Sequence, residues 1–384
     1  MTPEIEISQE ALDSLPNCLL VDMRDAESVA YGVIPGAVPL PPERLSAEVP
    51  ALCAGRPVVL YCARGQFSVD AAEDLRRLGV EAYSLEGGYA GWLLHRMQRE
   101  RETSLQQQIE EGIRKTWHKR LFSKFAKAIR TYDLVKPGDR IAVCISGGKD
   151  SMLMAKLFQE LYRHHKFPFE LKFLVMDPGY NETNRKVIEH NARLLGVPIT
   201  IFETDIFNIV YNEEKNPCYL CARMRRGYLY SKARELGCNK IALGHHYDDV
   251  IETILMGMLY GAQVQTMMPK LHSTNFPGME LIRPMYLIRE ADIKAWRDRN
   301  DLHFIQCACR FTDTCTTCDP SGRTVSKRME IKQLIAQLKK INPSVEANIF
   351  RSMENVNLNT VISYKQGDQV HSFLDRYDEI QAKE

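Results

Sequence analysis

Short apolar runs alternate with segments of helical periodicity along most of the chain. Near its beginning, apolar runs at 18–23, 57–61 and 81–85 predict strands, and the periodic segment 67–78 predicts a helix. Strands that alternate with helices favour a parallel sheet that is covered on both faces. We therefore expect residues 1–99 to form a small α/β domain.

A longer series of the same kind follows in the second part of the chain. Its strands and helices are predicted in turn at 140–145, 152–164, 171–176, 181–195, 198–202, 223–236, 240–243 and 248–260. This series predicts a doubly wound parallel sheet for residues 114–384, with ligands at the carboxyl ends of the strands. Residues 100–113 are polar and lack glycine and proline before Gly112, so we expect a helical linker there.

Composition and charge exclude some classes of protein. The hydrophobic share of 45% and the charged share of 26% are ordinary for a soluble globular protein. Residues 1–10 contain three glutamates and no basic residue, unlike a signal peptide, and no apolar segment is long enough to span a bilayer. We therefore expect a cytoplasmic protein with no membrane contact.

The net charge of +1 conceals an uneven distribution of charge. Residues 1–100 carry 8 Lys/Arg and 15 Asp/Glu, whereas the rest of the chain carries 42 and 34. Residues 114–130 contain seven Lys/Arg and no acid, with Trp117, Phe122 and Phe125 between them. A basic segment with aromatics suits a polyanion such as RNA, but an amphipathic helix with a solvated face has the same pattern. One helix can serve both roles.

The most specific motif is the hexapeptide S-G-G-K-D-S, which joins a predicted strand to a predicted helix. Adjacent glycines allow a tight turn, and consecutive free amides at a helix N-terminus bind anionic oxygens. The lysine can neutralise charge, and the two serines can donate hydrogen bonds. The spacing differs from that of a Walker A loop. The candidate phosphate-binding residues are Ser146, Gly147, Gly148, Lys149, Asp150 and Ser151.

Three carboxylates also fall at the ends of predicted strands. Asp177 ends the strand 171–176, and Asp248 and Asp249 follow the strand 240–243. Carboxylates beside a triphosphate can hold Mg²⁺, so we include all three in the candidate nucleotide site. The alternative role for Asp248 is to cap the helix that begins there.

Seven of the eleven cysteines stand where sulfur or metal chemistry is expected. Cys62 directly follows a strand and leads into a helix, where backbone amides lower a thiol pKa and stabilise a thiolate or persulfide. Cys218 and Cys221 form a C-x-x-C pair that can bind one metal or one iron of a cluster. The other four have the pattern C-x-C-x5-C-x2-C, which also suits zinc, and are Cys307, Cys309, Cys315 and Cys318.

Residues 1–99 resemble a single rhodanese domain, a sulfurtransferase module. The resemblance rests on L-V-D-M-R at 20–24, I-P-G-A at 34–37, the Cys62 loop and L-E-G-G-Y-A-G-W at 85–92. It implies that Cys62 accepts sulfur as a persulfide. The chain departs from the family at two positions that bear on the choice of sulfur donor, Val33 and Phe67.

The second part resembles the ATP-pyrophosphatase superfamily, whose PP-loop has the form S-G-G-x-D-S. Within it, residues 114–330 resemble the tRNA 2-thiocytidine synthetase family, through P-C-x-x-C-x-R-x-R-R-G from Pro217 and G-H-H-x-D-D from Gly244. These resemblances imply an adenine nucleotide alpha hydrolase-like fold that binds ATP with Mg²⁺. Members of the superfamily activate an oxygen by adenylation and release pyrophosphate.

The same resemblance implies an iron–sulfur centre. In that family the C-x-x-C pair, here Cys218 and Cys221, holds a [4Fe-4S] cluster together with one later cysteine. By position after Phe304-Ile305-Gln306 the later ligand is Cys307, and Cys309 is the alternative. Zinc at the four later cysteines would compete for Cys307.

We therefore expect an ATP-dependent tRNA sulfurtransferase, with cytidine converted to 2-thiocytidine as the implied reaction. Its expected partners are tRNA, a sulfur donor such as a cysteine desulfurase or a thiosulfate-like compound, and a second copy in a homodimer. One alternative is a PP-loop enzyme that thiolates another tRNA base or a small metabolite. Another is a non-catalytic sulfide or redox sensor with an Fe–S or zinc centre, which would have no use for pyrophosphate release.

Overall fold

The chain folds into two compact units. They comprise Met1–Leu105 and Gln106–Glu384, which we call the first and second unit. The computed structural model describes residues 5–15, 17–164, 166–207, 217–305 and 327–377.

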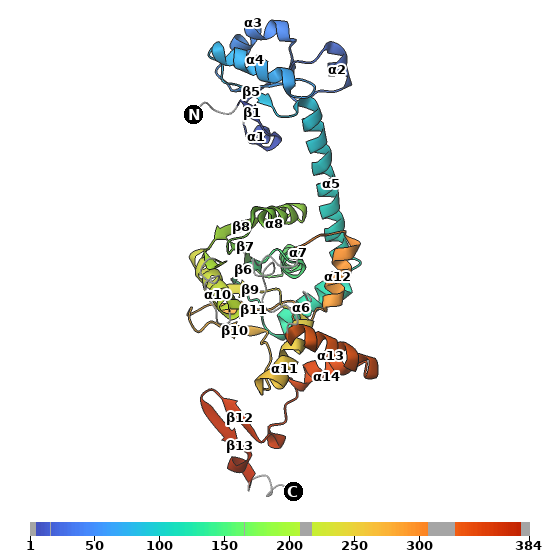
Figure 1. Cartoon of the computed structure of the whole chain (residues 1–384), viewed down its shortest axis with the longest axis vertical. Coiled ribbons are helices and arrows are strands. Elements are labelled where there is room, and N and C mark those ends of the chain that lie inside the picture. The colour runs from blue at the N-terminus through green and yellow to red at the C-terminus, as the bar shows by residue number, and fades with distance from the viewer. Residues whose placement is uncertain (1–4, 16, 165, 208–216, 306–326, 378–384) are drawn as a thin grey trace, which may run out of the picture. The chain divides into compact units, whose positions relative to one another are not determined.

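The first unit contains a five-stranded sheet whose strands all run parallel. The strand order is β1-β5-β4-β2-β3, with β1 at Glu6–Ile7, β2 at Leu19–Asp22, β3 at Val38–Pro39, β4 at Val58–Tyr61 and β5 at Ala82–Leu85. Figure 1 labels β1 and β5 of this sheet. Its shorter helices are α1 (Gln9–Asp13), α2 (Ala26–Tyr31), α3 (Pro42–Cys53) and α4 (Gln66–Arg77). Strands β2 and β4 are buried on both faces of the sheet. Their side chains contribute to one hydrophobic cluster on one face and to a second cluster on the other. The predicted small α/β domain is confirmed.

A glycine turn between β5 and the next helix packs on the loop that follows β4. Gly88 has φ +58°, and a Cβ atom there would lie 2.4 Å from the Cys62 carbonyl oxygen. The amide of Tyr89 donates to that same carbonyl at 2.9 Å, and the amide of Ala90 donates to the Ala63 carbonyl at 3.1 Å. Only glycine allows the two backbone segments to approach so closely.

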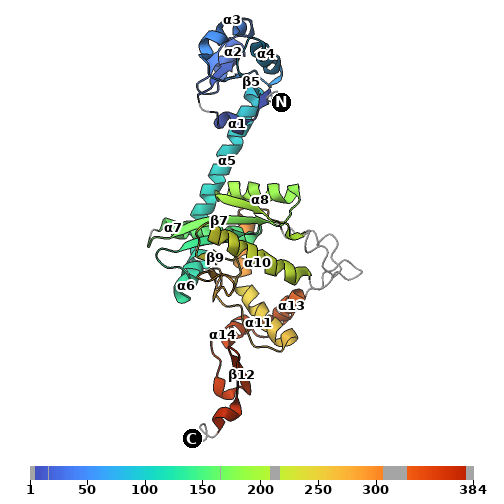
Figure 2. The same ribbon diagram turned by 90° about the vertical axis from the view of Figure 1, so that its left-hand side faces the viewer.

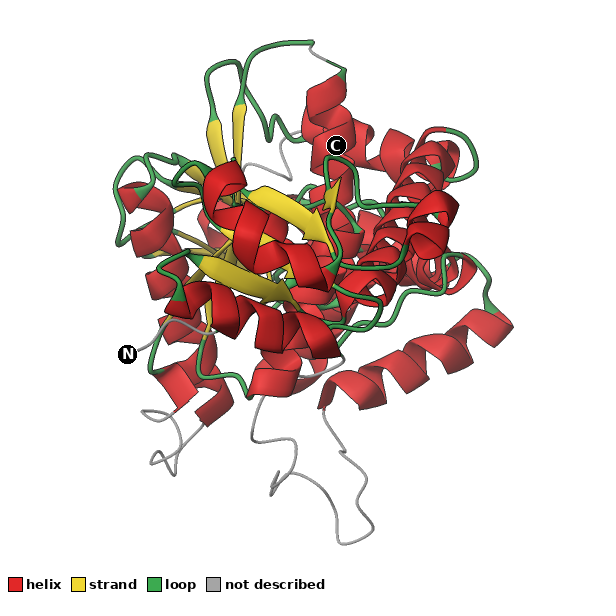
Figure 3. Ribbon diagram, turned by 90° about the horizontal axis from the view of Figure 1, so that it is seen from above, coloured by secondary structure: helices red, strands yellow, loops and turns green. Residues whose placement is uncertain are grey.

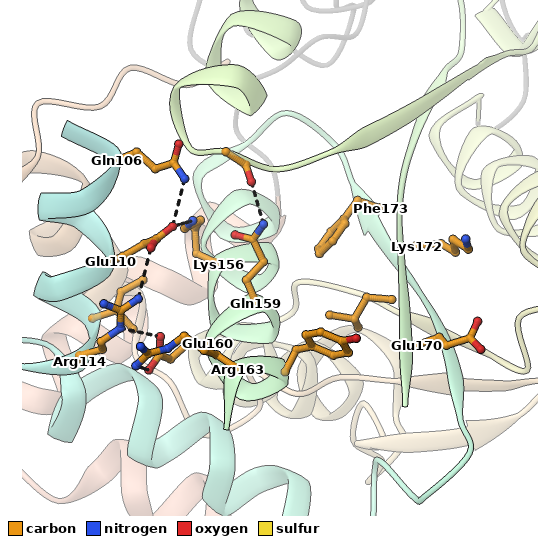
Figure 4. A pocket seen from close by; sticks show the side chains of 14 residues that line it. Gln106, Glu110, Arg114, Lys156, Gln159, Glu160, Arg163, Glu170, Lys172 and Phe173 are labelled. Atoms are coloured by element: carbon orange, nitrogen blue, oxygen red, sulfur yellow. Dashed lines mark hydrogen bonds and ion pairs between the residues drawn. The ribbon is translucent and has the colours of Figure 1, made fainter. Parts of the chain in front are cut away.

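The helix α5 (Gly88–Arg114) begins in the first unit and ends in the second. The linker expected to be helical therefore lies within one continuous helix of 27 residues. Near the end of α5, Ile109 and Ile113 are fully buried, and Glu110 accepts a hydrogen bond from the buried Lys156 at 2.9 Å (Figure 4). The last turns of α5 are thus part of the core of the second unit.

The second unit is built on a six-stranded sheet with the order β10-β11-β9-β6-β7-β8. Its strands are β6 (Arg140–Ile145), β7 (Glu170–Asp177), β8 (Ile199–Glu203), β9 (Lys240–Ala242), β10 (Lys270–His272) and β11 (Glu280–Ile282). All of the pairs are parallel except β10 with β11. Its helices are α6 (Ser123–Thr131), α7 (Lys149–Arg163), α8 (Glu182–Leu194), α10 (Pro217–Glu235), α11 (Tyr247–Gly261), α12 (Glu290–Arg299), α13 (Lys327–Ile341) and α14 (Val345–Ser352).

The sheet is covered by helices (Figures 2 and 3). Leu229, Tyr230 and Ala233 of α10 pack on a face that carries Cys144 and Met176. Because β6, β7, β9 and β11 are parallel, their carboxyl ends share one edge of the sheet. The loops that follow these strands therefore meet at that edge.

The basic segment 114–130 is amphipathic, which agrees with its expected role as a helix with one packed face and one solvated face. It contains a π-helical turn at His118–Phe122 and then α6, with Trp117, Leu121 and Phe125 buried. Several cations remain exposed on the other face, namely Lys115, Lys119, Arg120, Lys127 and Arg130. An RNA-binding role for this face stays a prediction.

The chain continues after the sheet into α13, α14 and a small antiparallel hairpin, β12 (Ser363–Gln366) with β13 (Gln369–Ser372). Helices α11, α13 and α14 pack against one another. None of the helices in the described ranges is long and apolar enough to cross a membrane.

The glycine turn at the Cys62 loop gives a prediction about stability. Replacing Gly88 by alanine should destabilise residues 58–77 by about 1–3 kcal/mol, because a Cβ atom would meet backbone at 2.4 Å. Gly36→Ala is the matched control, since Gly36 has φ +84° but open space around it. Amide hydrogen exchange of peptides from 58–77, followed by mass spectrometry on the full chain, measures the difference. Equal protection in both variants would contradict the steric argument.

Candidate active site

The hexapeptide at 146–151 forms a tight loop between β6 and α7. Gly147 has φ +82°, and Gly148 is the N-cap of α7. The Ser151 hydroxyl accepts from the Ser146 amide at 3.1 Å and donates to the Gly148 carbonyl at 3.0 Å. Ser151 is only 4% exposed, and its hydroxyl forms hydrogen bonds within the loop. We had expected this hydroxyl to donate to a ligand. The amides of the loop and the N-terminus of α7 are the groups here that can bind an anion.

The charged groups of the loop are held by a carboxylate from α12. The Lys149 ammonium lies 3.0 Å from Asp150 Oδ2 and 3.3 Å from Glu290 Oε1. Burial raises the pKa of Glu290, but Lys332 and Lys149 outweigh it and hold this pKa at about 2. The other carboxylate oxygen of Asp150, Oδ1, is buried without a hydrogen-bond partner among the described residues.

A cavity of about 660 Å³ opens beside this loop. Ser146, Asp150 and Ser151 line one side of it, and Cys221 of α10 lines another. The wall also carries apolar side chains, three arginines, a histidine and a carboxylate, namely Ile145, Met176, Leu243, Arg225, Arg226, Arg283, His245 and Asp249. The sheet edge thus places the hexapeptide loop and a cysteine of the C-x-x-C pair around one space.

The three carboxylates from strand ends have different roles in the structure. Asp177 accepts from the amides of Gly179 and Tyr180, at 2.9 and 2.6 Å, and so shapes the loop after β7. Asp248 accepts from the Arg289 side chain at 3.0 Å and from the Glu290 amide at 2.7 Å. Neither carboxylate lines the cavity, whereas Asp249 does.

The capping role considered for Asp248 is wrong. The N-cap of α11 is His246, whose ring accepts from the Asp249 amide, while Asp249 accepts from the His246 amide. The helix begins one residue earlier than expected, so Asp248 falls in its first turn and contacts α12 instead.

Of the cysteines in the second unit, the structure describes the placement of only some. Cys221 is partly exposed at the cavity wall. Cys218 lies in the first turn of α10, but its side chain is outside the described part of the structure. The four later cysteines also lie outside the described residues, and they are Cys307, Cys309, Cys315 and Cys318.

A second cavity, of about 670 Å³, lies away from the carboxyl edge (Figure 4). The amino-terminal half of β7 lines it, together with α5 and α7. Most of its charged groups already pair with one another, among them Lys156 with Glu110 at 2.9 Å and Arg114 with Glu160 at 3.0 Å. This arrangement is typical of a structural contact between helices.

The first unit contains a separate candidate centre at Cys62. Its sulfur accepts from the Gly65 amide at 3.2 Å and lies 3.6 Å from the Ser68 hydroxyl, which in turn accepts from the Ser84 hydroxyl at 2.9 Å. Burial raises the pKa of the Cys62 thiol. Hydrogen bonds from the Ser68 hydroxyl and from the amides of Arg64, Ser68 and Phe67 together lower this pKa by more than burial raises it, so the net shift is downward. This loop therefore favours an anionic sulfur.

Comparison with known proteins gives a family match for each of the two domains. Residues 117–310 match the PP-loop domain family, and residues 8–95 match the rhodanese-like domain family. The tRNA-cytidine(32) 2-sulfurtransferase of Anaeromyxobacter dehalogenans is 36% identical over 241 residues, which cover 62% of this chain and 79% of the relative. The chain belongs to this family of PP-loop proteins.

Further similar proteins were found. The tRNA-cytidine(32) 2-sulfurtransferase of Alkalilimnicola ehrlichii is 37% identical over 63% of this chain and 74% of its own length. A solved structure of the U34-tRNA thiolase NcsA from Methanococcus maripaludis, with its [4Fe-4S] cluster, is 23% identical and covers 60% of this chain and 76% of that chain, with a TM-score of 0.47. The expected combination of a rhodanese domain with a PP-loop domain is confirmed by the two family matches.

Glu290 is a residue of the PP-loop site that sequence reasoning missed. It lies 141 positions after Lys149, and nothing near the hexapeptide indicates it. The only local signal is an acidic first turn in α12, which is common at helix N-termini.

The Cys62 loop gives a prediction about acidity. Ser68→Ala should raise the pKa of the Cys62 thiol, because it removes the largest of the hydrogen bonds that favour the thiolate. The alkylation rate of Cys62 by iodoacetamide, followed at peptide level against pH, should show its midpoint moving upward. Alkylation of Cys18, whose pKa is raised by burial, serves as the internal control. An unchanged Cys62 midpoint would contradict this account of the loop.

Proposed function

We propose that the protein is an ATP-dependent sulfurtransferase that converts a cytidine of tRNA to 2-thiocytidine. One observation carries the proposal: a single cavity is lined by both the PP-loop and Cys221. A reaction that activates a base with ATP and then delivers sulfur to it needs both functions around the same atom. The activities of the curated relatives support the choice of tRNA and of cytidine.

The loop residues act on the nucleotide. The amides of 147–149 and the N-terminus of α7 bind the departing phosphates, and Lys149 neutralises their charge. The cytosine O2 oxygen attacks the α-phosphorus, and the bond from that phosphorus to the pyrophosphate oxygen breaks. Sulfide then adds to the activated C2 carbon, and AMP leaves with the former O2 oxygen. The apolar wall at Ile145, Met176 and Leu243 suits a nucleobase.

The residues at the loop also fit a magnesium ion. Asp150 Oδ1 is a buried carboxylate oxygen without a hydrogen-bond partner in the described chain, and Asp249 lies on the same cavity. Asp248 is less suited, because it does not line the cavity. We therefore assign Mg²⁺ to Asp150 and Asp249.

The thiolates fit an iron–sulfur cluster. Cys221 presents a sulfur at the cavity wall, and C-x-x-C spacing on a helix start allows Cys218 to join it. Cys307, or Cys309 in its place, is the proposed third ligand. When bound, a [4Fe-4S] cluster with three protein ligands keeps one iron open to carry sulfide. A zinc site or sulfur relay at Cys309, Cys315 and Cys318 is the alternative use of the later cysteines.

The rhodanese-like domain is proposed to supply sulfur. The lowered pKa of Cys62 suits a thiolate that accepts a sulfane sulfur atom from a cysteine desulfurase or a thiosulfate-like compound and so forms a persulfide. A thiol reductant then releases this sulfur as sulfide, and the thiol is oxidised to a disulfide as the Cys62 thiolate is restored. The exposed cations at 115–130 are proposed to contact the RNA backbone. A homodimer and a cytoplasmic location remain proposals as well.

The first test separates ATP chemistry from sulfur chemistry. Lys149→Ala should lower tRNA-dependent pyrophosphate release by about a hundredfold or more, because the charge on the departing group loses its counter-ion, while bound iron stays unchanged. In contrast, the Cys221→Ala variant should contain no bound iron and form no 2-thiocytidine, but it should still bind ATP. Pyrophosphate assays, iron analysis and nucleoside mass spectrometry measure these effects. The proposal fails if the wild-type protein forms no 2-thiocytidine with ATP, tRNA and sulfide.

The second test concerns the sulfur donor. Cys62→Ser should abolish thiolation that is driven by thiosulfate but leave thiolation that is driven by free sulfide. Serine keeps the hydrogen bonds of the loop and cannot form a persulfide. Nucleoside mass spectrometry after incubation with each sulfur source gives the comparison, and Cys53→Ser is a control at another buried cysteine of the same unit. Equal thiolation by the Cys62 variant with both sources would leave the domain without a donor role.

A further inference from the structure

Arg283 is a buried cation that lacks a counter-ion among the described residues. It directly follows β11, is 6% exposed and lines the cavity. Its Nη1 atom donates to the Met268 carbonyl and its Nε atom donates to His245 Nδ1 at 3.4 Å. No carboxylate in the described ranges forms an ion pair with Arg283, and Arg225 and Arg226 beside it are equally unpaired there. Burying a charge without a partner is costly, so the site is built for an anion.

The opposite side of the loop shows a different arrangement. There each cation has a carboxylate partner: Lys149 and Lys332 pair with Glu290 at 3.3 Å each, and Arg328 pairs with Glu252 at 3.1 Å. Arg289 likewise pairs with Asp248 at 3.0 Å. The unpaired positive charge of the cavity is therefore concentrated on the wall that carries Arg283.

His245 adds an uncharged donor to this wall. Because the Arg283 Nε–H donates to Nδ1, the ring proton resides on Nε2. Burial, and then the charge of Arg283, lower the pKa of His245 to about 4, so the ring is neutral at physiological pH. Arg283 and His245 thus present N–H donors with one positive charge between them.

The sheet order indicates which anion this wall receives. Strands β11, β9 and β6 are adjacent, so Arg283, His245 and the PP-loop follow neighbouring strand ends. We propose that Arg283, with His245, binds the α-phosphate of the nucleotide, while the PP-loop binds the phosphates that leave as pyrophosphate. This inference rests on the proposed function. It makes Arg283 a catalytic residue, because its charge stabilises the α-phosphate during attack and again as AMP departs.

Binding of two product fragments tests the assignment. Arg283→Gln should weaken AMP binding by about tenfold or more and leave pyrophosphate binding within about twofold, whereas Lys149→Ala should weaken pyrophosphate binding more than AMP binding. Arg223→Gln is the matched control, since Arg223 is exposed on the same helix as Arg225 but does not line the cavity. Isothermal titration calorimetry of the full-length protein gives the affinities, and thermal unfolding checks the fold.

Several outcomes would overturn the proposal. They are unchanged AMP affinity in Arg283→Gln, an equal loss in Arg223→Gln, or normal AMP affinity with a loss of tRNA affinity and a shallower salt dependence. The last result would assign the wall to an RNA phosphate. If Arg283→Gln does not fold, Arg225→Gln replaces it and must still weaken AMP binding by about threefold or more. AMP and pyrophosphate binding require neither tRNA nor sulfur, so the phosphate site and the proposed thiolation can fail independently.

Discussion

The parallel pairing of β6 with β9 is the constraint on which the active site depends. The pair sets Ile141 opposite Lys240 and Val143 opposite Ala242, and the loops that follow the two strands then meet. The approach is so close that a Cβ atom on Gly244 would lie 3.2 Å from the Ser151 amide nitrogen. A side chain at position 244 would therefore require the PP-loop backbone to shift by a few tenths of an ångström. With β11 paired to the other side of β9, the same edge brings Arg283 into the cavity, although it lies more than a hundred residues beyond the loop.

The periodic pattern of the sequence was sufficient for most of the fold, because buried parallel strands are short apolar runs and their helices are amphipathic. The strands at 140–145 and 171–176 and the helix at 152–164 are found within a few residues of the predicted bounds. The tight loop between β6 and α7 was also predictable, since adjacent glycines between an apolar run and a helical pattern indicate such a turn. The role of the Ser151 hydroxyl was not predictable, because its hydrogen bonds to Ser146 and Gly148 depend on the exact backbone conformation of the turn.

Errors arose where a side chain had a choice of partners distant in sequence. Aspartate is a residue type that is favoured at the N-cap of a helix, yet His246 is the N-cap of α11, and Asp248 contacts Arg289 and Glu290 instead. A carboxylate near a helix start gains from the helix dipole in either place, so the local pattern cannot distinguish them. The position of α12 determines which partners Asp248 contacts, and that position depends on how the strands and helices pack at this edge of the sheet. Glu290 was missed for the same reason.

The two candidate sites stabilise negative charge by different means, which follows from what each must release. At Cys62 the hydrogen bonds that lower the thiol pKa come from neutral donors, the Ser68 hydroxyl and backbone amides. Neutral donors stabilise an anionic sulfur without a salt bridge that would have to be broken on transfer. The cavity wall of the second unit instead holds the Arg283 guanidinium, which forms no ion pair with any residue that the structure describes. Full charge is the stronger means of binding a phosphate, and it is suited to a group that must be held while its bonds are exchanged. The proposed sulfur carrier and the proposed phosphate-binding wall therefore differ in their electrostatics for a chemical reason, and one chain can contain both because each is built by its own sheet.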